Sequence, residues 1–161
     1  MSSPPLVLKR QRNLYLKSQL EEMGKLTGRV VLADELESIE QFATIRQSAQ
    51  RFIGQPVTAC EIPFCDKNSE RFESFIARLK AANPSPVYVI TPRSDSCGVL
   101  KVSSLRDVRF DFDFSINDDG ILVFSTMDHE DKLLLDFSIA PSGEQMMKVE
   151  TQGANWAKIA Y

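Results

Sequence analysis

Apolar residues in the first half of the chain recur at steps of three and four, which is the period of an amphipathic helix. This spacing predicts helices over residues 14–23 (ending around Gly24), 35–53 and 69–83. Asp34 is placed to cap the second helix and Gly54 to end it. Asn68 or Ser69 is placed to cap the third, which Asn83 would end because a proline follows it.

Farther along the chain, large apolar residues alternate with polar ones, which is the period of a half-buried strand. Strands are predicted at residues 57–64, 87–91, 99–103, 108–116, 121–126, 132–138 and 144–151. Short polar turns separate the last four, as in an antiparallel meander. We therefore predict one α+β domain over residues 1–161, with a mainly antiparallel sheet and two or three helices packed on one side.

The stretch RFDFDFSINDDG, residues 109–120, carries the sharpest alternation in the chain. Its final glycine favours a three-residue hairpin loop with the glycine in the left-handed conformation. That register would place Phe114 near Phe124 and gather the aromatic side chains on one face. Asp111 and Asp113 would then lie on the other face, whose mixture of acidic and apolar residues suits contact with a partner molecule.

Charge is unevenly divided along the chain, although the formal total is only −3. Residues 1–106 carry 15 basic and 11 acidic side chains, whereas residues 107–161 carry 4 and 11. This acidic final third argues against nucleic acid as a ligand of that part of the chain, because phosphate binding needs clustered cations. Only the basic cluster Lys9, Arg10, Arg12 and Lys17 is a candidate for RNA contact. No apolar run has the length of a membrane span or of a signal-peptide core. We therefore expect a cytoplasmic protein that binds neither nucleic acid nor membrane.

Motifs for catalysis or metal binding are missing from the sequence. The three cysteines and the single histidine lack the spacing of a zinc site. The run from Asp111 begins like a calcium loop, but Ile116 and Leu122 stand where that loop needs glycine and glutamate. We expect no catalytic residue, no metal and no cofactor. A metal-dependent hydrolase that uses the acids of residues 107–136 stays open as an alternative.

Two stretches, VYVITPRSDSCGVLKV (87–102) and GILVFSTMDHEDKLLLDFS (120–138), resemble the C-terminal sheet of a family of bacterial inhibitors. These are the immunity proteins of contact-dependent growth inhibition and related polymorphic toxin systems. The likeness covers roughly residues 85–151 and includes no active-site motif. It implies a non-enzymatic protein that binds a cognate toxin domain, commonly a nuclease, and blocks its active site.

An acidic surface would suit that role, because nuclease toxins tend to be basic where they meet phosphate. We expect the partner-binding surface to consist of Asp111, Asp113, Asp118, Asp119, Asp128, Glu130, Asp131 and Asp136. An adaptor or regulatory domain that binds a protein other than a toxin would show the same acidic sheet, and it is the main alternative.

Overall fold

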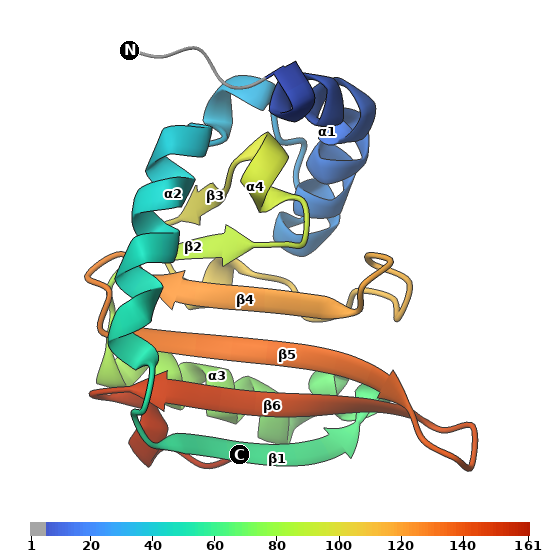
Figure 1. The fold of residues 1–161 in the computed structure, drawn as a ribbon. Coiled ribbons are helices and arrows are strands. Elements are labelled where there is room, and N and C mark those ends of the chain that lie inside the picture. The colour runs from blue at the N-terminus through green and yellow to red at the C-terminus, as the bar shows by residue number, and fades with distance from the viewer. Residues whose placement is uncertain (1–5) are drawn as a thin grey trace.

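A six-stranded antiparallel sheet forms the centre of the protein (Figure 1). The computed structural model describes residues 6–161. The strands are β1 (Val57–Pro63), β2 (Val87–Ile90), β3 (Leu100–Val102), β4 (Ile121–Thr126), β5 (Asp131–Ile139) and β6 (Gln145–Gly153). Their order in the sheet is β1-β6-β5-β4-β2-β3. The predicted α+β class and mainly antiparallel sheet are confirmed, and β4, β5 and β6 form the last three of the four strands predicted for the C-terminal meander.

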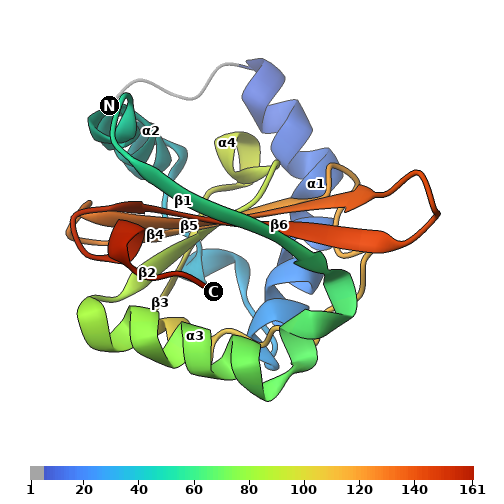
Figure 2. The same ribbon diagram turned by 90° about the horizontal axis from the view of Figure 1, so that it is seen from below.

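Helices cover both faces of the sheet, so the prediction that they pack on one side is wrong. The helices are α1 (Leu6–Thr27), α2 (Ile39–Ser48), α3 (Glu70–Ala82) and the single turn α4 (Ser94–Cys97). Figure 2 shows α3 on one face of the sheet, with α2 and α4 on the other. The reason is visible in β2, which is apolar on both sides. Val87 and Val89 belong to the core that contains α3, whereas Tyr88 packs with Phe42 and Ile45 of α2.

Helix α1 is longer than predicted at both ends, because it begins at Leu6 and not at residue 14 and continues through Gly24. A Cβ atom at Gly24 would lie 3.0 Å from the carbonyl oxygen of Arg29, so glycine at this position makes room for the returning chain. The helix stops at Thr27 instead, where Gly28 adopts the left-handed conformation with φ of +68°.

Helix α2 begins later than predicted. Its N-cap is Ser38, whose hydroxyl accepts a hydrogen bond from the Gln41 amide, and not Asp34. Asp34 lies instead in the short 3₁₀ turn η1 (Ala33–Glu35). After α2 the chain tightens into a second 3₁₀ turn, η2 (Ala49–Phe52). The Ser69 cap of α3 is confirmed, since its hydroxyl accepts from the Phe72 amide.

The predicted strand over residues 108–116 is wrong, and so is the hairpin that would pair Phe114 with Phe124. Both edges of β4 are already occupied, one by β2 and the other by β5. The segment therefore lies across the α3-side face of the sheet and makes no ladder with it. The predicted left-handed glycine is confirmed, since Gly120 has φ of +64°.

Candidate functional site

The eight predicted acidic residues do not form one surface. Four of them, Asp111, Asp113, Asp118 and Asp119, lie between residues 111 and 119, which we call the acidic segment. Three others, Asp128, Glu130 and Asp131, lie between residues 128 and 131, which we call the acidic turn. Strand β4 separates these two groups by its whole length, roughly 17 Å. Asp136 lies on β5 beside Ile121, just after the acidic segment, and on the face of β5 opposite its core residues.

Aromatic contacts hold the first part of the acidic segment in place. The ring of Phe112 lies 6.0 Å from that of Phe64 and 5.7 Å from that of Phe137, and Phe114 lies 5.1 Å from Phe64. Because alternate residues of an extended chain point to opposite sides, these rings direct Asp111 and Asp113 toward solvent. Both aspartates are exposed. Their Cα atoms lie about 7 Å apart, the spacing of alternate residues in an extended chain.

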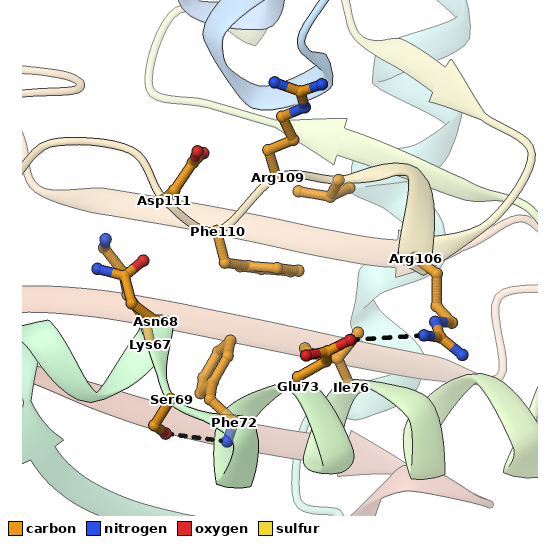
Figure 3. Close-up of a pocket in the computed structure, with 11 residues that line it drawn as sticks. Lys67, Asn68, Ser69, Phe72, Glu73, Ile76, Arg106, Arg109, Phe110 and Asp111 are labelled. Carbon is orange, nitrogen blue, oxygen red and sulfur yellow. Dashed lines mark hydrogen bonds and ion pairs between the residues drawn. The ribbon is translucent and has the colours of Figure 1, made fainter.

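A groove of about 360 Å³ lies between the start of α3 and the chain that leads into the acidic segment (Figure 3). We call it the α3 groove. Its residues are Lys67, Asn68, Ser69, Phe72, Glu73, Ile76, Arg106, Val108, Arg109, Phe110 and Asp111. Phe110 and Phe72, which both line it, pack edge to face with ring centroids 5.2 Å apart, and Arg106 approaches Glu73 to 3.8 Å. The groove thus combines apolar and charged side chains, a mixture that can bind a partner side chain and orient it.

Lys67 lies under the acidic segment and is almost entirely buried, with 4% of its surface exposed. Its Nζ atom lies 4.4 Å from the ring centroid of Phe64 and 4.8 Å from that of Phe112. Burial lowers the pKa of Lys67, and the nearby charges of Asp111 and Asp113 oppose that shift. Lys67 therefore contacts the aromatic rings under the acidic segment and lies close to the charges of Asp111 and Asp113. No motif in the sequence predicts this position for the lysine.

The second part of the acidic segment is tied to α1 and to β4 through one amide side chain. Asn117 donates to the Glu22 carboxylate and to the Ile121 carbonyl, both at 3.0 Å. Its oxygen accepts from the Gly120 amide at 2.7 Å. Asp118 and Asp119 are thus carried on an anchored loop. Asp118 also lies 3.5 Å from Arg93 yet keeps its side chain 90% exposed.

Glu22 is the most strongly perturbed acid near this loop. Its burial raises its pKa from 4.5 to about 7, although the hydrogen bond from Asn117 and the charge of Arg93 act in the opposite direction. The anchor of the loop therefore includes a carboxyl group that changes charge near neutral pH.

Two carboxylates of the acidic turn, those of Asp128 and Asp131, accept hydrogen bonds from neighbouring parts of the protein. Asp131 has no exposed surface, and its oxygens accept hydrogen bonds of 2.7–2.8 Å from Asn83, Asn155 and the Trp156 amide. Asp128 accepts from Asn83 and also from the Ser85 hydroxyl, at 3.1 Å. Burial alone would raise the pKa of Asp128, but hydrogen bonds from the Thr126 side chain, the Glu130 amide, Ser85 and Asn83 outweigh it and hold the pKa below its usual value. Asp131 thus holds the C-terminal segment in place and is not available to a partner.

Metal ligands do not gather anywhere in residues 6–161, where no three His, Cys, Asp or Glu side chains are placed to share an ion. The cysteines are all free thiols, with Cys97 buried, Cys60 half-buried and Cys65 exposed.

Within residues 6–161 no helix has both the length and the apolar character that a membrane span requires.

Comparison with known proteins gives no relative for this chain. No family model, no curated protein and no solved structure matches it. The resemblance to immunity proteins therefore stays a prediction that comes from two stretches of sequence.

Proposed function

We propose that this protein is an immunity protein, which binds a cognate toxin domain through the acidic segment and the α3 groove and covers the toxin's active site. The observation that carries the proposal is the way in which Asp111 and Asp113 are held. Both are exposed, while the phenylalanines that alternate with them are fixed in the core. Carboxylates held in place by buried neighbours bind a partner with little loss of side-chain freedom.

The charges suit a partner whose own binding site is basic. The acidic segment presents four exposed carboxylates, and of these only Asp118 has an ion-pair partner within residues 6–161. A nuclease active site that binds phosphate is the kind of surface that such carboxylates would attract and then occupy. The neighbouring α3 groove would accept an apolar side chain of the same partner.

The proposal is tested by reversing these charges. A variant with Asp111, Asp113, Asp118 and Asp119 all changed to lysine should fail to protect cells against the toxin domain encoded beside the gene. Its association with that domain, measured by surface plasmon resonance, should be slower by roughly 10- to 100-fold. Association of the unchanged protein should slow as salt is added, because screening weakens the attraction.

A matched control changes the total charge equally at exposed acids elsewhere. Glu21, Glu40, Glu61 and Glu144 are exposed and make no ion pair with any residue from 6 to 161. Changing these four to lysine should leave protection intact. Full protection by the first variant would remove the acidic segment from the interface. If the unchanged protein neither protects nor forms a complex, the immunity proposal itself is wrong, and the adaptor alternative takes its place.

A further inference from the structure

A second cavity, of about 440 Å³, lies at the other end of β4, beside the acidic turn. We call it the turn cavity. Three stretches of chain enclose it, and its residues are Arg51, Phe52, Gln55, Pro56, His129, Glu130, Gly153, Ala154, Ala157 and Lys158. It shares no residue with the α3 groove. The proposed function makes no use of it.

The walls of the turn cavity are fixed by buried side chains behind them. Gln152 donates to the carbonyl oxygens of Phe52 and Gln55, which holds the first wall. Asp131 accepts from the amides of Asn155 and Trp156, which holds the third. The cavity is therefore formed before any ligand arrives, as in most small-molecule sites.

Hydrogen-bond donors outnumber acceptors among the side chains that line the cavity. Arg51, His129 and Lys158 supply N–H groups, and neither His129 nor Lys158 has a side-chain partner within residues 6–161. The sole carboxylate in the lining belongs to Glu130, whose contact with Arg51 is long, at 3.4 Å. The other carboxylates of the acidic turn, Asp128 and Asp131, do not line the cavity and are hydrogen-bonded by their own neighbours. A ligand that satisfies the free donors must bring acceptor oxygens.

His129 is held in a conformation that a hairpin turn normally gives to glycine. Its φ is 61°, and no other non-glycine residue in the described chain has a positive φ. A histidine tolerates this region better than most residues, but at a cost in stability. A glycine at this position would relieve the strain. The presence of histidine therefore indicates that its side chain, at the edge of the cavity, has a function.

We propose that the turn cavity binds a small anionic molecule, a carboxylate or a phosphate monoester with an apolar body. His129, Arg51 and Lys158 would hold the oxyanion. The apolar body would lie against Phe52 and Pro56 and the two alanines opposite them. The volume of 440 Å³ exceeds what a bare phosphate ion fills, which is why the ligand needs an apolar part.

Titration of the whole protein with simple probes tests this inference. Benzoate and phenyl phosphate carry the two oxyanions on the same ring, and benzyl alcohol is the neutral control. We expect amide shifts in NMR spectra at residues 129–130 and 153–158 with one or both anions and none with benzyl alcohol. The tighter anion identifies the oxyanion that the site prefers. Equal binding of all three probes, or no binding of either anion, would overturn the proposal.

Three variants assign the binding to named side chains. Changing Arg51 and Lys158 together to glutamine should weaken anion binding at least tenfold, whereas the exposed pair Arg10 and Lys101 changed to glutamine should not affect it. His129→Gly should stay folded, because glycine favours the observed φ, and should bind more weakly. Glu130→Gln should bind more tightly, because it removes the carboxylate that competes for Arg51. Weaker binding by Glu130→Gln, or unchanged binding by the Arg51 and Lys158 variant, would contradict an anion site.

Discussion

The acidic segment and the acidic turn look alike in sequence but differ in what surrounds their carboxylates. In the segment, Asp111 and Asp113 alternate with phenylalanines that are fixed in the core, and their carboxylates face solvent. In the turn, Asp131 is buried and accepts hydrogen bonds from Asn83, Asn155 and Trp156. The difference shows that an exposed acid with no buried donors around it stays available to a partner, whereas an acid surrounded by buried donors is used by the fold.

Removal of the buried carboxylate should have the largest effect on folding. Asp131→Ala removes the acceptor of four hydrogen bonds, so we expect the free energy of unfolding to fall by roughly 3–5 kcal/mol. Urea denaturation measures this change. Asp119→Ala, at an exposed acid of the segment, is the matched control and should change stability by less than about 0.5 kcal/mol. Equal losses in the two variants would abolish the distinction between the two regions.

Glu22 allows the anchor of the acidic segment to be tested by pH. The folded-state pKa of about 7 lies above the ordinary value of 4.5, so the folded protein binds this proton more tightly than the unfolded chain does. This contribution to stability is fully present below pH 4.5 and is lost as pH rises through about 7. Glu22→Gln should therefore stabilise the protein by about 3 kcal/mol at pH 8 and have little effect at pH 4.

Denaturation curves of both proteins at several pH values measure this difference. Glutamine keeps the oxygen that accepts from Asn117, so the loop should stay in place. A constant difference between the two proteins from pH 4 to pH 8 would show that the Glu22 carboxyl does not titrate near neutrality.

His129→Gly tests how much the strained backbone of the acidic turn costs in stability. Glycine adopts the observed φ of 61° without strain, so we expect the variant to be more stable by about 1 kcal/mol. The shift in melting temperature measures it, with His129→Ala as the control because alanine keeps the strain. A loss of stability in the glycine variant would mean that the histidine side chain contributes more to the fold than its conformation costs.

Substitutions of Asp111 and Asp113 should have the smallest effect on stability, although these residues are central to the proposed binding surface. Asp111→Asn and Asp113→Asn should each change the free energy of unfolding by less than about 0.5 kcal/mol, because both residues are exposed. The same variants should slow association with the toxin domain. A large loss of stability would show that these carboxylates serve chiefly to neutralise Lys67.

The alternation of FDFDF was enough to identify the inward and outward sides of residues 110–114, but not their hydrogen-bonding partners. A period of two describes any extended chain, whether it lies in a sheet or across one. Strands β2 and β5 occupy the two edges of β4 and exclude residues 108–116 from pairing with it. This pairing involves residues distant in sequence, so a local pattern cannot predict it. The sheet class was predictable because several strands alternate and short turns separate them. The presence of helices on both faces depended on β2, which is apolar on both sides.

The candidate site was less predictable than the fold for a similar reason. Eight acids could be chosen by charge, but the burial of Asp131 depends on Asn83 and Asn155, which are distant from it in sequence. Lys67 carried no signal, since one lysine in a short turn has no periodicity. The strain at His129 also appears only in the backbone angles.

The acidic segment is attached to the sheet by side-chain packing and not by backbone hydrogen bonds of a strand ladder. This attachment determines which of its positions can be substituted without loss of the fold. Every second residue is fixed by packing, while the residues between them contribute little to stability. The outward positions of the segment can therefore vary without disturbing a strand register. A protein that must recognise one partner and ignore its close relatives can acquire a new specificity at such positions while keeping its fold.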